Sequence, residues 1–152
     1  MILATDSIFV TAVKSNSELV EIVDGRIYGT AIPVPDEDID NVPVPYVILT
    51  FDGLNNDTGT KDDRFESEYD HVNIGVEIAA DTLENLHNLT KMVRETILGY
   101  FRENETAVED YTFSADAIQY DSLRPCYWQA LRYQCDVYNL EDDEQENEQE
   151  NG

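Results

Sequence analysis

Positive charge is scarce in this sequence, where 9 Lys and Arg residues stand against 33 Asp and Glu residues and the net charge is −24 over 152 residues. Proteins that bind nucleic acid contact its phosphates through clustered Lys and Arg. The composition therefore argues against sequence-specific nucleic-acid binding, and it disfavours binding to an anionic membrane surface for the same reason.

Long apolar runs and a cysteine framework are also missing. No stretch approaches the roughly 18 apolar residues of a spanning helix, and the first six residues lack the basic region of a signal peptide. We therefore expect a cytoplasmic protein that binds no membrane. Cys126 and Cys135 lie nine residues apart, which matches neither a disulfide framework nor a metal motif. We expect two reduced thiols, of which one or both pack in a strand.

The residue patterns of enzymes are absent as well. There are two histidines, His71 and His87, and the sequence contains no Gly-x-Ser-x-Gly, His-Glu-x-x-His or Gly-rich phosphate loop. Residues 52–59 (DGLNNDTG) superficially resemble a calcium loop, but they lack the closing Glu of an EF-hand. We therefore predict no catalytic residue, no cofactor and no metal site, and we expect that the protein is not an enzyme.

The first part of the chain has a helical pattern. Residues 2–24 place apolar side chains at helical spacings, interrupted at residues 15–17, where Ser17 is expected to cap a second short helix. Gly25 is the expected C-cap. Residues 26–28 read as a brief extended segment, and the four prolines within residues 29–45 predict an extended surface loop.

The rest of the chain predicts strands around one long helix. Apolar runs or alternation indicate strands at residues 46–51, 69–80, 112–120 and 127–138. The second of these strands is expected to pair antiparallel with the first, across a charged loop or hairpin arm at residues 53–68. A capping-box spacing at residues 81–84 begins a helix that ends near residue 102 or 103. The prediction is an α+β fold in the order α-α-β-β-α-β-β. Its sheet is mixed or antiparallel with about four strands, and helices pack on one face.

Residues 141–152 (EDDEQENEQENG) contain no apolar residue and seven acids. Such a segment buries too little area to offset its ordering entropy, which predicts a disordered acidic tail after a single domain of residues 1–140. Without these seven charges the net charge changes from −24 to −17, so the domain itself is acidic.

Four residues are candidates for an interface. Trp128 and Arg132 share one face of the last predicted strand, and Trp and Arg often anchor interfaces. The alternative is that Trp128 packs under the proline-rich loop. Lys61 and Arg64 are cations in an acidic loop, where they are expected to pair with acids of a neighbouring subunit.

The layout resembles the tail-completion, or tail-terminator, proteins of long-tailed bacteriophages and prophages. The resemblance covers roughly residues 2–140. It rests on a helical N-terminus ending in DGRIY (24–28), a proline-rich stretch leading into VPYVIL (44–49), an alternating strand, a long helix, and a closing strand with LRYQCDVY (131–138). The resemblance implies a structural subunit without enzymatic activity that forms a ring, commonly a hexamer.

In this family the ring caps the tail tube and joins it to the head. The implied partners are other copies of the chain, the tail tube protein and a head-completion or connector protein. The implied locations are the bacterial cytoplasm during assembly and then the virion tail or neck.

The acidity shapes this hypothesis and suggests a competitor. Six domains at −17 would give a ring of about −102, so we expect acids to avoid the contacts, and we expect part of them to line the bore, where they would repel DNA. The main alternative is an acidic DNA mimic that occupies the basic cleft of a nucleic-acid enzyme, with carboxylates in regular stripes. Another phage neck or connector component is a further alternative.

Overall fold

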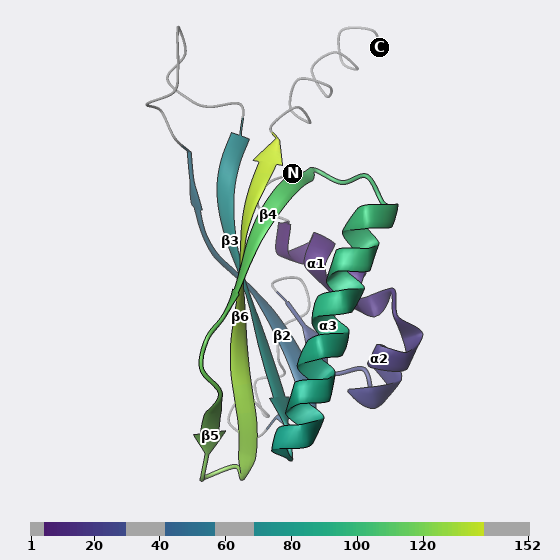
Figure 1. Ribbon diagram of the computed structural model, residues 1–152, viewed down its shortest axis with the longest axis vertical. Helices are drawn as coiled ribbons and strands as arrows, with labels where there is room; N and C mark the ends of the chain where they lie inside the picture. The colour runs from purple at the N-terminus through teal and green to yellow at the C-terminus, as the bar shows by residue number, and fades with distance from the viewer. Residues whose placement is uncertain (1–4, 30–41, 57–68, 139–152) are drawn as a thin grey trace, which may run out of the picture.

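The computed structural model of the protein describes residues 5–29, 42–56 and 69–138 (Figure 1). The helices are α1 (Thr5–Lys14), α2 (Ser17–Ile22) and α3 (Leu83–Glu103). The strands are β1 (Ile27–Tyr28), β2 (Tyr46–Asn55), β3 (Tyr69–Ala80), β4 (Val108–Ala115), β5 (Gln119–Asp121) and β6 (Cys126–Tyr138). The acidic tail of residues 141–152 lies outside the described residues, as do residues 57–68 of the charged loop.

The six strands of the described residues form one mixed sheet in the order β1-β2-β3-β6-β4, with β5 also paired to β6. β1 runs parallel to β2, and the other pairings are antiparallel. The predicted α+β class is confirmed, as is the antiparallel pairing of β2 with β3. The predicted count of about four strands is too low, because the described order is α-α-β-β-β-α-β-β-β.

The additional strands are short, which is why the sequence pattern does not separate them. β1 has two residues, too few for alternation to be recognised, and it corresponds to the expected extended segment. The expected strand at residues 112–120 starts earlier and is divided into β4 and β5. β4 ends where Ala115 pairs with Leu131, and β5 begins where Gln119 pairs with Trp128. Three residues of this edge therefore face two residues of β6, which is a β-bulge.

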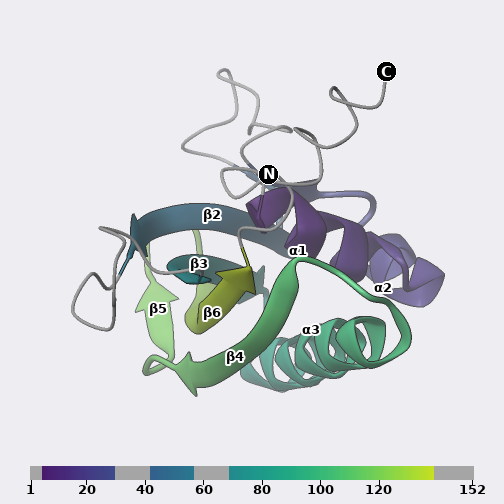
Figure 2. The same ribbon diagram turned by 90° about the horizontal axis from the view of Figure 1, so that it is seen from above.

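The helices cover one face of the sheet, as predicted (Figures 1 and 2). In β3 the alternating side chains of residues 72, 74, 76 and 78 are fully buried, and they pack with apolar residues of α1 and α3 in one core. An aromatic cluster lies in this core, where the ring of Tyr133 contacts those of Phe9, Tyr111 and Phe113 at centroid distances of 5.1–5.2 Å. No helix in the described part of the chain is long and apolar enough to cross a membrane.

The helix caps lie one residue from their expected positions. Asn16, not Ser17, caps α2, because its backbone is extended and its side-chain oxygen accepts from the N–H groups of Glu18 and Leu19. After α2, the N–H of Asp24 donates to the carbonyl of Glu21 and that of Gly25 to the carbonyl of Val20. This is a Schellman motif with Asp24 in the left-handed position and Gly25 one residue later.

A side chain also caps the first turn of α3. Thr82 caps α3 by accepting from the N–H of Asn85 at 3.1 Å, and the helix ends at Glu103 within the expected range.

Both cysteines lie in β6, carry free thiols and are fully buried. Burial is the first cause that raises the pKa of Cys135, to about 12, and it also raises the pKa of Cys126. The expectation of packed, reduced thiols is confirmed.

The burial of α3 predicts unequal costs for two substitutions on the same helix. Ile97 is fully buried and Leu83 is 44% exposed. Ile97→Ala removes core contacts and leaves a cavity, so we expect a loss of about 2–5 kcal/mol in the free energy of unfolding. Leu83→Ala should cost less than about 1 kcal/mol. Urea unfolding followed by circular dichroism measures both, and equal losses would contradict the described packing.

Candidate functional site: the open face of the sheet

The face of the sheet away from the helices carries mostly polar side chains. We call it the open face, and its central positions are Thr50 and Asp52 of β2, Asn73, Gly75 and Glu77 of β3, and Arg132 and Gln134 of β6. These positions alternate with the buried ones, because successive side chains of a strand point to opposite faces. One strand pattern therefore generates both the core and this surface.

Gly75 lies at the centre of the open face, between Thr50 on one side and Arg132 on the other. A Cβ atom at position 75 would lie 2.7 Å from the hydroxyl of Thr50 and closer still to a carboxylate oxygen of Asp52. The missing side chain at Gly75 thus lets neighbouring polar groups lean over β3. Asp52 reaches this place because a register shift between Phe51 and Gly53 makes it the extra residue of a β-bulge.

The second bulge, between β4 and β5, brings Asp116 to the same face. Its backbone N–H donates to the carbonyl of Ala130, and its carbonyl accepts from the side-chain amide of Gln129. The carboxylate of Asp116 accepts from Nε and one terminal nitrogen of Arg132, at 2.9–3.0 Å. This two-pronged contact fixes the guanidinium plane.

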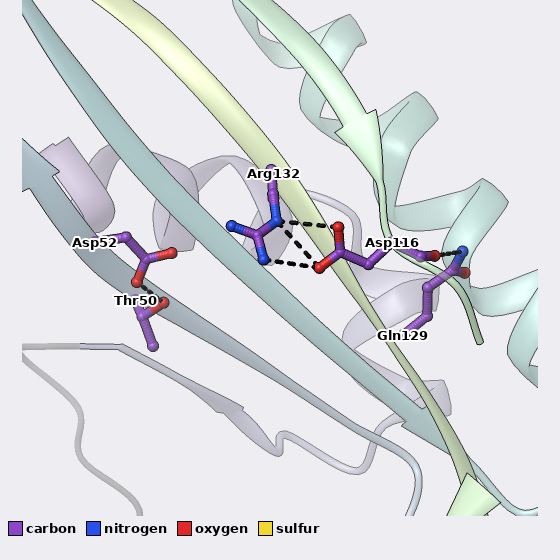
Figure 3. A network of polar contacts seen from close by, with 5 residues as sticks. All are labelled: Thr50, Asp52, Asp116, Gln129 and Arg132. Carbon is purple, nitrogen blue, oxygen red and sulfur yellow. Dashed lines mark hydrogen bonds and ion pairs between the residues drawn. The ribbon is translucent and has the colours of Figure 1, made fainter. Parts of the chain in front are cut away.

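On the open face, Arg132 therefore lies between two carboxylates. One belongs to Asp52 of β2 and the other to Asp116, which follows β4 (Figure 3). Asp116 bonds it directly. Asp52, whose other contact is the hydroxyl of Thr50 at 2.7 Å, also contributes to raising the pKa of Arg132, after the larger effects of Asp116. The side chain of Arg132 remains 66% exposed. A partner molecule can therefore reach a cation whose orientation is already set.

A shallow pocket of about 300 Å³ adjoins this network. Its polar lining comes from four strands, with Asp52 of β2, Asn73 of β3, Thr112 and Ser114 of β4, and Arg132 and Gln134 of β6. Within residues 5–29, 42–56 and 69–138, no group of three or more His, Cys, Asp and Glu residues is placed to hold a metal ion. The surface offers hydrogen-bond donors and acceptors around one oriented cation, an arrangement that suits a polar contact with another molecule.

Other acids of the open face are also held by neighbours on the same chain. The carboxylate of Asp136 lies 2.7 Å from Nδ1 of His71, and Glu77 accepts from the hydroxyl of Tyr46 at 2.8 Å. Burial, and then the charge of Glu77, raise the pKa of the Tyr46 hydroxyl. Each of these acids is thus fixed by an intramolecular bond.

Trp128 lies on the same face as Arg132, near the end of the sheet where β6 begins. It is half-buried against a small cluster of Val42, Tyr46 and Ala79, together with Val44. Residues 42 and 44 belong to the proline-rich stretch, so the alternative that Trp128 packs under this stretch is supported by the described contacts. An interface role for Trp128 and Arg132 stays a prediction. Lys61 and Arg64 lie outside the described residues.

The structure adds residues that sequence reasoning did not select. Asp52, Gly75 and Asp116 build the surroundings of Arg132, but no spacing links them, because they come from β2, from β3 and from the link between β4 and β5. A glycine within a strongly alternating strand was the one available signal, since it often marks a close approach of other groups.

Comparisons with known proteins bear on the fold. No protein-family model matches the sequence, and no curated protein matches it. A chain in the solved structure of the virion of a native gene transfer agent particle aligns with 86% of this chain and 92% of its own, with 8% sequence identity and a TM-score of 0.51. A structure from Akkermansia muciniphila, described as lacking its transmembrane region, aligns with 59% of this chain and 44% of its own. With an identity of 11% and a TM-score of 0.26, this structure is too different to support a conclusion about the present fold.

The alignment with the virion chain covers nearly the whole of both chains, so it concerns the complete fold and not one motif. At 8% identity it shows a shared fold. The class of protein that the fold defines is therefore a small α+β domain of a kind also present in a virion particle. A shared fold does not by itself assign a function.

The ion pair on the open face predicts a change in carboxyl titration. Hydrogen bonds from Arg132 are the first cause that lowers the pKa of Asp116, and those from Arg124 lower the pKa of Asp121 in the same way. Arg132→Gln should raise the pKa of Asp116 towards its ordinary value and leave Asp121 unchanged. Arg124→Gln should do the reverse. Carboxyl carbon NMR across an acid titration measures both values.

The sign of the linked stability effect follows from the direction of the shift. Because folding lowers the pKa of Asp116, the pair stabilises the fold above the unfolded pKa of about 3.9 and loses this effect as the pH falls through the folded value. The effect on stability should be small because the pair is exposed to solvent. An unchanged pKa of Asp116 in the Arg132 variant would contradict the described contact.

Proposed function

We propose that this chain is a structural subunit of a phage-like virion, and specifically a tail terminator that caps the tail tube and contributes to head–tail joining. The observation that carries the proposal is the fold shared with a chain of the gene transfer agent virion, over 86% and 92% of the two chains. The resemblance of residues 2–140 to tail terminators supports the finer assignment. Another neck or connector subunit would also suit the shared fold.

In this role the protein acts by binding and not by chemistry. It forms a ring of about six copies, with the tail tube protein and a head-completion or connector protein as its further partners. It is made in the bacterial cytoplasm and is then incorporated in the virion tail or neck. A polar open face with an oriented cation supports such a surface function, because it offers contacts in place of a reactive group.

The charge of the chain constrains how the ring is built. Copies that each carry a net charge of −24 repel one another, so the contacting surfaces must be poor in acids or must pair them. We place part of the remaining acids along the bore, where they would repel DNA phosphates during passage. A neutral or basic bore in a solved ring would disprove this assignment.

The DNA-mimic alternative finds less support in the described residues. A mimic needs carboxylates that are free to meet basic residues of its target in regular rows. On the open face, Asp52, Glu77, Asp116 and Asp136 are each bonded to a neighbour on the same chain. They point to Thr50, Tyr46, Arg132 and His71 and do not form a free row.

Ring formation has a measurable mass and a measurable response to salt. We expect light scattering after size exclusion to give a mass near six times the 17.3 kDa of one chain at high protein concentration. The ring should become more stable from about 0.1 M to about 1 M salt, because the screening length falls from about 10 Å to about 3 Å. A monomer at every concentration and salt level would contradict the proposed ring.

The capping role predicts a defect in tail assembly when the gene is deleted from the phage or prophage that encodes it. Without a cap, tube polymerisation has no stop, so electron microscopy should show tails of irregular, excessive length without attached heads. The wild-type gene supplied in trans should restore uniform tails. Uniform tails joined to heads in the deletion strain would rule out the terminator role.

A further inference from the structure

An apolar projection stands at the turn between β5 and β6. Leu123 is 93% exposed in this turn, and Tyr120 beside it is 56% exposed. Asp121 holds the turn in shape, since its carboxylate accepts from the backbone N–H groups of Leu123 and Arg124 and from Nε of Arg124 at 3.0–3.3 Å. A large apolar side chain is thus presented to solvent on an ordered backbone, so little backbone conformational entropy is lost when it binds.

A hollow of about 450 Å³ lies on the other side of the molecule. We call it the α3 hollow, and its apolar lining consists of Ile22, Val44, Pro45, Ala80, Leu89 and Met92. The polar residues of its lining are Asp81, Asn85 and Asn88. Its size and apolar lining suit one or two apolar side chains from another molecule.

The two features carry almost no net charge, in a chain with a net charge of −24. In the turn, the one acid, Asp121, is paired with Arg124. In the α3 hollow, Asp81 is the one charged lining residue. Since most of the surface of an acidic chain repels a second copy, surfaces with paired or few acids are the places where two copies can meet.

The positions of the two features suit a closed ring. Both lie at the same end of the molecule, where α3 begins and where β5 turns into β6 (Figure 1). They are set apart across the sheet, because the hollow is lined by Ala80 of β3 and by Val44 and Pro45, which lead into β2. β5 is two strand spacings from β3 and three from β2, about 10–14 Å. A head-to-tail contact between different surfaces at equal height repeats around an axis and can close.

We propose that Leu123 and Tyr120 of one copy insert into the α3 hollow of the next copy and so form the repeating contact of the ring. This inference rests on the proposed ring function and names the surfaces that build it. The partner is therefore a second copy of this chain, bound in a heterologous arrangement.

The first test compares two leucine substitutions that add the same charge. Leu123→Asp places a carboxylate on the projection, and we expect a rise of about tenfold or more in the protein concentration needed for half-assembly. Leu54→Asp is the matched control, because Leu54 is 42% exposed and lies in β2 at the other end of the sheet, opposite Val72. It should assemble like the wild type. Light scattering gives the masses, and thermal melting establishes that both variants are folded.

The second test traps the contact itself. Both native cysteines are buried, so single cysteines introduced by Leu123→Cys and Asn88→Cys are the accessible thiols of the described residues. A short bismaleimide should link an equal mixture of the two variants into dimers, and neither variant alone should be linked at this contact. The double variant should give a ladder of bands that ends at the ring number.

The outcomes separate this inference from the proposed function. A ring that forms normally with Leu123→Asp, or a mixture that fails to link, overturns the inference and leaves the ring standing, with the α3 hollow then open to another virion subunit. Linking by Leu123→Cys alone would also overturn it, because it indicates a symmetric contact. A wild type that stays monomeric and unlinked overturns both the inference and the proposed ring.

Discussion

The pairing of β3 on both of its edges is the constraint on which the rest of the structure depends. β3 pairs with β6 from Tyr69 to Ala80 and with β2 along most of its length. Its strict alternation sends one set of side chains to a single face, and that face must be covered by apolar surface. α3 and α1 supply it, and the aromatic cluster around Tyr133 fills the space between helices and sheet. The opposite face, carried by the same strands, is left to polar residues.

This open face owes its detail to departures from regular pairing. The bulge at Asp52 and the one at Asp116 each turn a carboxylate towards Arg132, and Gly75 leaves the room above β3 that the first of them uses. The result is a cation fixed in orientation and still largely exposed. Such a surface is suited to a polar contact with another molecule.

Acidity imposes the second constraint, and it bears on the proposed assembly more than on folding. Within one chain, acids of the open face are compensated by a hydroxyl, a histidine or an arginine. Between two copies of the chain, acids that meet without a partner would repel one another, so surfaces with few acids are favoured for contact. The turn that carries Leu123 and the α3 hollow are two places that combine exposed apolar area with little net charge. An assembly made through them would avoid the repulsion that the composition otherwise imposes.

The sequence by itself determined the elements with strong periodicity. The bounds of β3, the end of α3, the antiparallel β2–β3 pair and the one-sided packing of helices all follow from local patterns of apolar residues. The caps are Asn16 and Thr82, each one residue from the expected position, because neighbouring polar side chains compete to cap the same helix end. Strand β1 has two residues and is too short to give a sequence signal. Only the tertiary structure decided the surroundings of Arg132, the half-buried place of Trp128, and the placement of Leu123 and the α3 hollow at one end of the sheet. The physical reason is that periodicity reports which side of an element is buried, whereas bulges and strand order, which bring distant residues together, depend on the whole sheet.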